Sequence, residues 1–191
     1  MPITLIMSDA PDFAAVIAAA KAGEGGAFAT LFDALGRSVA GYLRGRGVED
    51  PDGAANEVFL RVFTRVGKFE GDEAQFRSWV FTIARNLAVD EQRARVRRAT
   101  VTAINGSVAR LSGSNVANDV VSDRHVDDLV ASLTREQRDV ILLRFVADLS
   151  IEQTADVIGK PPSAVKALQH RALNALRKQL QPHDIAAASA V

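Results

Sequence analysis

Apolar residues in the first half of the chain recur every three or four positions, which is the spacing of one face of an α-helix. Three stretches show this pattern: residues 27–44, about 51–66 and about 75–98. Gly45 and Gly47 end the first stretch, and the alternating β-branched runs typical of strands are scarce. We therefore expect an all-α protein whose N-terminal part is a compact bundle of three to four helices.

The pattern changes between residues 99 and 126, where Ser, Thr, Asn, Gly and Val replace the helical periodicity. We interpret this segment as a flexible linker. Helical periodicity returns over residues 127–133 and 134–146, and Thr134 precedes Gln137 at the spacing of a capping box. The expected organisation is two small helical domains, residues 13–98 and 127–181, joined by a linker over residues 99–126.

The segment "SIEQTADVIGKPPSAVKALQHRALNAL", residues 150–176, predicts a helix-turn-helix. Ser150 is a suitable N-cap for a helix over residues 151–158, and Gly159 suits the left-handed residue that ends it. Pro161 forces the preceding residue into an extended conformation, so a second helix begins afterwards. Ala155 provides a small side chain where the two helices approach closely.

The second of these helices is expected to have a polar, cationic face. At 100° per residue, the side away from its apolar stripe carries Ser163, Ala167, His170, Arg171, Asn174 and Lys178, with Lys166 and Arg177 on the flank. No Asp or Glu occurs between Asp156 and Asp184, so a phosphate backbone could approach without repulsion. These features favour a recognition helix in the major groove of DNA. The alternative is an amphipathic helix whose polar side only faces water.

Overall composition limits the other classes of protein. The 23 basic and 23 acidic residues give a formal charge of zero, so any polyanion binding must come from local clusters. With no cysteine, disulfides, thiolate zinc sites and a cysteine nucleophile are excluded. The apolar run at residues 14–20 is too short to span a bilayer and follows no basic segment. We therefore expect a cytoplasmic protein without membrane insertion.

The usual signs of an enzyme are missing from the sequence. His125, His170 and His183 are scattered, no glycine-rich phosphate loop follows a strand, and no paired carboxylates stand out in an apolar pocket. No second histidine lies at ligand spacing from His170, which is expected to be a neutral contact or stacking group. We expect neither a catalytic centre nor a bound metal or cofactor.

Two segments carry a resemblance to a known family. The first is residues 133–180, "LTREQRDVILLRFVADLSIEQTADVIGKPPSAVKALQHRALNALRKQL". It resembles region four of the extracytoplasmic-function sigma factors, which are bacterial transcription initiation subunits. The second is residues 56–98, "NEVFLRVFTRVGKFEGDEAQFRSWVFTIARNLAVDEQRARVRR", and is similar to their region two. With the helix before residue 56, the matches cover about three quarters of the chain. A helix-turn-helix alone is weakly specific, whereas both segments in the family's order are strong evidence.

The resemblance implies that the second helix docks on the clamp helices of core RNA polymerase. The side chains that would make this contact are Asp52, Asn56, Glu57 and Arg61. They offer a polar, partly acidic face to a basic partner, and the alternative is an ordinary solvated face. Gly53, Ala54 and Asn56 depart from the residues usual in the family, which affects individual contacts more than the docking itself.

The segment "KFEGDEAQ", residues 68–75, matches a family loop that captures an unstacked base of the minus-ten promoter element. Removing a base from a duplex costs roughly a few kcal/mol, which a preformed pocket can offset. The resemblance assigns this element to Phe69, Glu70, Gly71, Asp72, Glu73, Ala74, Gln75 and Asn86. For Phe69, a position in the core of the bundle is an equally good interpretation as a place in the base pocket. Trp79 lies on the apolar stripe, so we expect it in the core rather than at a melting wedge.

Two further groups of residues are expected to contact DNA. Arg93, Arg95, Arg97 and Arg98 place four guanidiniums within six residues, which suits the phosphates of the minus-ten duplex, although a solvated run of charge is the alternative. For the minus-thirty-five element, the resemblance points to Lys166, Ala167, His170 and Arg171, and the helical wheel adds Ser163 and Asn174. Leu168 and Gln169 depart from the family pattern, so the family's sequence preference does not transfer.

The sequence therefore predicts an alternative sigma factor that binds core RNA polymerase and promoter DNA, and the resemblance also implies an anti-sigma partner. One competing hypothesis is a two-domain helix-turn-helix regulator that acts without polymerase. In such a protein, the loop at residues 68–75 and the polymerase-facing helix would have no evident task. Another is a sigma mimic that sequesters a regulator, which would not require the arginine cluster or an acid-free recognition helix.

Overall fold

The computed structural model describes residues 12–104, 129 and 132–180. This part of the chain contains seven α-helices, one short 3-10 helix and no β-strand, so the predicted all-α class is confirmed for it. Most of the predicted helix over residues 127–133, the first eleven residues and the C-terminal tail lie outside the described residues.

The N-terminal unit consists of α1 (Phe13–Lys21), α2 (Gly25–Gly45), α3 (Pro51–Arg65), the 3-10 helix η1 (Val66–Lys68) and α4 (Glu73–Ile104). The last three α-helices match the three predicted stretches, whereas the sequence analysis did not predict α1. Helix α4 also continues six residues beyond its predicted end and into the predicted linker. Ala99 and Thr100 are exposed, so this extension lacks the apolar stripe that would have indicated a helix.

The C-terminal unit contains the predicted helix-turn-helix. Its helices are α6 (Arg135–Phe145), α7 (Ile151–Ile158) and α8 (Pro162–Leu180). Capping boxes at Thr134 and Ser150 start α6 and α7, and each uses a glutamine three residues later. Gly159 ends α7 in the left-handed conformation, with φ of 67°. These local signals fix the angle at which α8 leaves α7.

Aromatic side chains form much of the core of the N-terminal unit. Phe76, which is 1% exposed, has its ring centroid 5.2 Å from Phe69, 5.7 Å from Phe13 and 5.8 Å from Trp79. Phe69 also stacks on Trp79 at 5.3 Å. The core position expected for Trp79 is confirmed. Two interpretations were open for Phe69, and its side chain lies in the core. This cluster packs on the core side of the loop between η1 and α4 and supports it.

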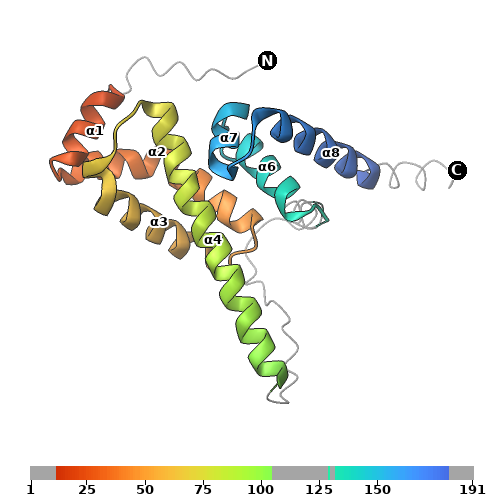
Figure 1. Cartoon of the computed structure of the whole chain (residues 1–191). Helices are drawn as coiled ribbons and strands as arrows, with labels where there is room; N and C mark the ends of the chain where they lie inside the picture. Colours follow the sequence, from red (N-terminus) through yellow and green to blue (C-terminus); the bar gives the residue numbers. More distant parts are fainter. Residues whose placement is uncertain (1–11, 105–128, 130–131, 181–191) are drawn as a thin grey trace, which may run out of the picture.

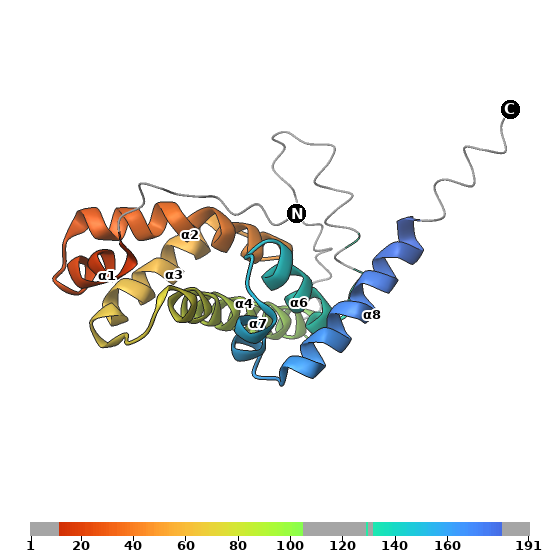
Figure 2. The same cartoon turned by 90° about the horizontal axis from the view of Figure 1, so that it is seen from above.

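The two units pack together along α4 and the C-terminal end of α2. In Figure 1, α1 and α3 lie on one side of α4 and α6, α7 and α8 on the other, while α2 crosses behind α4 and the C-terminal half of α4 projects from the body. Figure 2 shows the end of α2 beside α6. The main apolar core also crosses this boundary. Its members from the C-terminal unit are Leu142, Leu143, Ala147, Leu149 and Val157. The division into two domains stays a prediction from sequence, and in this structure the two units share one core.

Candidate nucleic-acid interface

Helix α8 presents its polar face to solvent. Val165, Leu168 and Ala172 are buried, because they pack against α6 and α7. On the other side of α8, exposed positions are Ser163, Lys166, Ala167, His170 and Arg171, and Asn174 is half-buried. The helix-turn-helix thus leaves the six residues selected from the sequence in reach of a macromolecule.

Side chains on this face contact one another along the helix. Arg171 Nε donates to the carbonyl oxygen of Ala167 at 3.2 Å. The Asn174 amide lies 3.3 Å from a ring nitrogen of His170, and Arg177 donates to the Asn174 oxygen at 3.3 Å. These contacts join residues three or four positions apart, so they hold donors on one side of α8. Arg177 therefore belongs to the same polar row as the predicted residues.

An acidic group also lies near this face, although α8 itself carries none. Glu152 is in the first turn of α7, outside the acid-free window of the sequence. Backbone N–H groups at the start of α7, the Ser150 hydroxyl and the charge of Lys166 lower the pKa of Glu152. Glu152 therefore stays ionised beside Lys166. The sequence analysis missed it because the two residues are neighbours only after α7 and α8 fold together.

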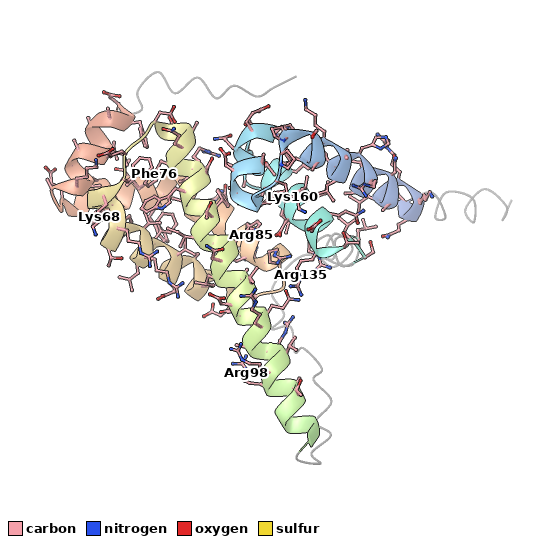
Figure 3. The ribbon with its side chains drawn as sticks, in the orientation of Figure 1. Lys68, Phe76, Arg85, Arg98, Arg135 and Lys160 are labelled. Atoms are coloured by element: carbon pink, nitrogen blue, oxygen red, sulfur yellow. The ribbon has the colours of Figure 1, made fainter. Side chains whose placement is uncertain are left out.

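The four arginines near the end of α4 are all exposed, but they do not form one cluster. Successive residues turn by 100°, so Arg93 and Arg97 share one side of α4, and Arg95 and Arg98 share the opposite side. The first pair lines a shallow hollow with Arg135 of α6. The second pair lines a hollow against the α2–α3 turn, where Arg95 donates to the carbonyl of Gly47 at 3.2 Å. Figure 3 shows Arg98 on the projecting part of α4.

The loop before α4 is held by a reciprocal pair of hydrogen bonds. The backbone N–H of Asp72 donates to Gln75 Oε1 at 2.9 Å, and the backbone N–H of Gln75 donates to Asp72 Oδ1 at 2.8 Å. This arrangement caps the start of α4. The segment from Glu70 to Gln75 is exposed above the buried Phe69 ring. The loop is therefore preorganised, with its backbone open to solvent.

Gly71 is required by this loop geometry. Its φ is 150°, and a Cβ at this position would lie 2.5 Å from Gln75 Oε1 and 3.1 Å from Phe69 Cζ. We predict that Gly71→Ala destabilises the protein by about 1–3 kcal/mol, because it strains the backbone and displaces the cap. Chemical denaturation measures this loss. Gly67→Ala is the matched control, since nothing lies within 4 Å of a Cβ there. Equal stability of the two variants would contradict the prediction.

Asn86 does not lie at the loop. It is exposed on α4, eleven residues after Gln75, which is roughly 16 Å along the helix. Helix α8 belongs to the other unit, so the structure presents the loop, the arginines and the α8 face as separate surfaces. No single small ligand could contact all of them, so a ligand that they share would have to be a macromolecule.

Helix α3 has a mixed surface on its exposed side. Asp52 and Asn56 are exposed, and Glu57 and Arg61 are half-buried and form an ion pair at 2.8 Å. Leu60 lies beside them and is 59% exposed. The sequence analysis missed Leu60, although it falls outside the buried positions of α3 and four residues after Asn56. Leu60 therefore adds one exposed apolar group to an otherwise polar and partly acidic face of α3.

Comparisons with known proteins identify the family of this chain. Residues 31–98 match the family described as Sigma-70 region 2, and residues 129–178 match Sigma-70, region 4. The chain is 32% identical over 182 residues to the ECF RNA polymerase sigma factor BldN of Streptomyces coelicolor, covering 93% of this chain and 69% of that protein. It is 31% identical over 132 residues to SigX of Bacillus subtilis, covering 65% and 68%. The chain belongs to the ECF sigma factors.

Members of this sigma factor family are transcription initiation factors and not enzymes. A solved structure shares the fold: RpoE of Bartonella quintana in complex with the anti-sigma factor NepR. Its TM-score is 0.67 at 19% identity, and the match covers 81% of this chain and 96% of that one. None of the helices described for this sigma factor has the length and apolar character needed to cross a membrane.

Proposed function

We propose that this chain is an alternative sigma factor that binds core RNA polymerase and directs transcription from promoters with two elements. In this proposal α8 reads the minus-thirty-five element, and the loop with α4 recognises and helps to melt the minus-ten element. The observation that carries the proposal is the presence of two cationic surfaces on two separate helical units of a sigma family member.

The exposed face of α8 supports contact with duplex DNA. Lys166 and Arg171 are charged donors for phosphates or guanine, and His170 and Asn174 add polar groups of the kind that contact base edges. Buried Val165 and Leu168 fix this helix against α6 and α7, so the donors have a defined orientation.

The loop from Lys68 to Gln75 supports capture of a single unstacked base. Its backbone is exposed, capped by Asp72 and Gln75, and rests on a rigid aromatic floor. A pocket that is already ordered offsets more of the roughly few kcal/mol needed to unstack a base than a loop that must first be ordered. The arginine pairs on both sides of α4 would then hold the neighbouring phosphates.

The mixed surface of α3 supports binding to the polymerase. Leu60 supplies an apolar centre, and Asp52, Asn56 and Glu57 surround it with polar and acidic groups. Such a surface complements a basic protein partner better than it complements DNA, which would be repelled by the carboxylates.

Run-off transcription tests the proposal. The purified chain is mixed with core polymerase and a library of genomic promoter fragments. Specific transcripts that need both components are expected. Duplex binding that is indifferent to polymerase would contradict the proposal and favour a helix-turn-helix regulator.

The arginine pairs make a separate prediction about the salt dependence of DNA binding. Replacing Arg93 and Arg97 with Ala removes up to two phosphate contacts, so the slope of log affinity against log salt should fall by up to about 2. Titrating the polymerase complex with promoter DNA at several salt concentrations gives the slope. Arg44→Ala with Arg65→Ala removes the same charge from exposed positions elsewhere. An unchanged slope for the α4 variant would remove this pair from the interface.

We also propose an anti-sigma partner for this chain. The solved structure of the same fold is a complex of a sigma factor with an anti-sigma factor. The expected result is a protein that binds the purified chain and suppresses its run-off transcription in proportion to its amount. A genomic two-hybrid screen that yields only polymerase subunits would contradict this part of the proposal.

A further inference from the structure

The boundary between the two units is shaped for close approach of α2 and α6. Gly41 and Gly45 lie one turn apart on α2 and face Val146 and Leu142 of the C-terminal unit. A Cβ at Gly45 would lie 2.5 Å from Leu142 Cδ2, and one at Gly41 would lie 3.0 Å from Val146 Cγ1. The two glycines therefore let the two units approach more closely than any larger residue would.

A buried carboxylate connects the units at this boundary. Asp139 of α6 is 1% exposed. The Tyr42 hydroxyl donates to its Oδ1 at 2.9 Å, and Arg85 Nε donates to its Oδ2 at 3.2 Å. Arg46 Nε lies 3.1 Å from Oδ1 as an ion pair. Both oxygens of a C-terminal carboxylate are thus satisfied by groups from the N-terminal unit, and Figure 3 shows Arg85 on α4.

We call the packing of the two units against each other the closed arrangement. The groups around Asp139 make its carboxylate necessary in this arrangement. Burial raises the pKa of Tyr42, and Asp139 raises it further, so Tyr42 stays a neutral donor. Burial, followed by the charge of Arg46, lowers the pKa of Arg138. Arg46 and Arg85 pair with this one carboxylate, and its charge also acts on Arg138. Without it, the buried Arg46 and the partly buried Arg85 would lose their shared counter-ion.

Two further contacts tie the C-terminal unit to the start of α4. Arg77 donates to the carbonyl of Ala147 at 2.8 Å, and Gln153 donates to the carbonyl of Ala74 at 2.9 Å. Ala74 belongs to the loop that we propose for base capture. In the closed arrangement, the first helix of the helix-turn-helix is therefore in contact with the proposed minus-ten site.

The closed arrangement cannot serve both promoter elements at once. Elements named for positions ten and thirty-five lie about 25 base pairs apart, which is roughly 85 Å along B-DNA. Two units that share one apolar core cannot reach across that distance. The units must separate before the proposed promoter complex can form.

We propose that the closed arrangement is an autoinhibited resting form and that Asp139 is its latch. The carboxylate neutralises Arg46 and Arg85 only while the units are together. Opening breaks this cluster and the Gln153 contact, and it frees the loop. This inference rests on the proposed function, since it concerns how the same DNA-binding surfaces are held back.

A reversible lock tests the inference directly. Because the chain has no cysteine, Gly41→Cys with Val146→Cys introduces the only two thiols. The spacing of 3.0 Å between a Cβ at position 41 and Val146 Cγ1 is close to the ~3 Å that a disulfide requires between one Cβ and the opposite sulfur. The oxidised protein should give at least ten-fold less run-off transcript than the reduced protein. Each single-cysteine variant cannot form the cross-link, so its transcript should be the same in the oxidised and reduced states.

The opposite change should release the latch. Asp139→Asn keeps the shape of the side chain and removes its charge, so the closed form loses its counter-ion. In the double-cysteine background, this variant should form the cross-link at least about ten-fold more slowly. Its radius of gyration in X-ray scattering should also increase while its helix content stays the same. Asp33→Asn, on the exposed side of α2, is the charge-matched control and should change neither quantity.

The outcomes separate this inference from the proposed function. If the oxidised and reduced proteins transcribe equally well, the closed form is competent and the latch is excluded, while the function stands. If the parent chain directs no transcription with core polymerase, the proposed function fails, and this inference fails with it. If Asp139→Asn cross-links as fast as the control, Asp139 is not the latch.

Discussion

Replacing Lys166 and Arg171 with Ala is expected to abolish promoter choice while leaving core polymerase binding intact. Both side chains are exposed on α8 and belong to neither apolar cluster of the C-terminal unit. Losing one specific DNA contact costs roughly 1–3 kcal/mol, so two losses should reduce promoter-specific transcript about 30-fold or more. Run-off transcription measures the transcript, and titration with labelled core enzyme measures the polymerase affinity.

The matched control removes the same charge elsewhere. Lys21→Ala with Arg37→Ala changes exposed positions on α1 and α2 and should leave promoter choice unchanged. Equal loss of polymerase affinity and of promoter choice in the α8 variant would count against its assignment as the recognition helix. A similar loss in the control would show that net charge, and not position, controls DNA binding.

Phe76→Ala should produce the largest loss of stability among these substitutions. The side chain is 1% exposed and contacts three aromatic rings, which come from α1, from the loop before α4 and from α4 itself. A buried Phe→Ala change typically costs about 3–5 kcal/mol, because it leaves a cavity. For a chain of this size, the melting temperature should fall by about 10 °C. Thermal unfolding followed by circular dichroism gives this value.

Phe145→Ala is the control for this prediction. Phe145 is 60% exposed at the end of α6, so its removal should change the free energy of unfolding by less than about 1 kcal/mol. Comparable shifts in the two variants would contradict the central position of the Phe76 cluster. The Phe76 variant should also weaken minus-ten recognition, since Phe69 above it supports the loop.

Local signals were the most successful part of the sequence analysis. The capping box at Thr134, the N-cap at Ser150 and the left-handed Gly159 were predicted from residues within a few positions of one another, and the structure contains all three. Each depends on backbone groups of a single helix end. Such features therefore need no knowledge of what packs against the helix.

Elements with weak periodicity were missed or shortened. Helix α1 is rich in alanine and buries only Val16, Ile17 and Ala20, so its apolar stripe is narrow. The last turns of α4 leave the body of the protein, so no buried stripe marks them in the sequence. Periodicity reports burial, so it cannot find helical residues that have no core to face.

The Asp139 cluster could not be found from sequence. In the segment around α6, Asp139 looks like one more charged residue among Arg135, Glu136 and Arg138. Its burial depends on Tyr42 and Arg85, which are 97 and 54 residues away in the chain. The surroundings of the α4 arginines are a similar case. One pair lies in a hollow beside the α2–α3 turn and the other in a hollow beside Arg135, and both neighbours are distant in the sequence.

If the units open as proposed, the apolar boundary between them would also affect how long the protein survives in the cell. When the units part, Leu142, Leu143 and Val157 lose their cover together. An opened molecule that has not reached the polymerase would carry a strip of exposed apolar surface, which favours aggregation and attack by proteases. Closed molecules would then form a durable reserve, while unengaged open ones are cleared, so turnover as well as synthesis would set the supply of active protein.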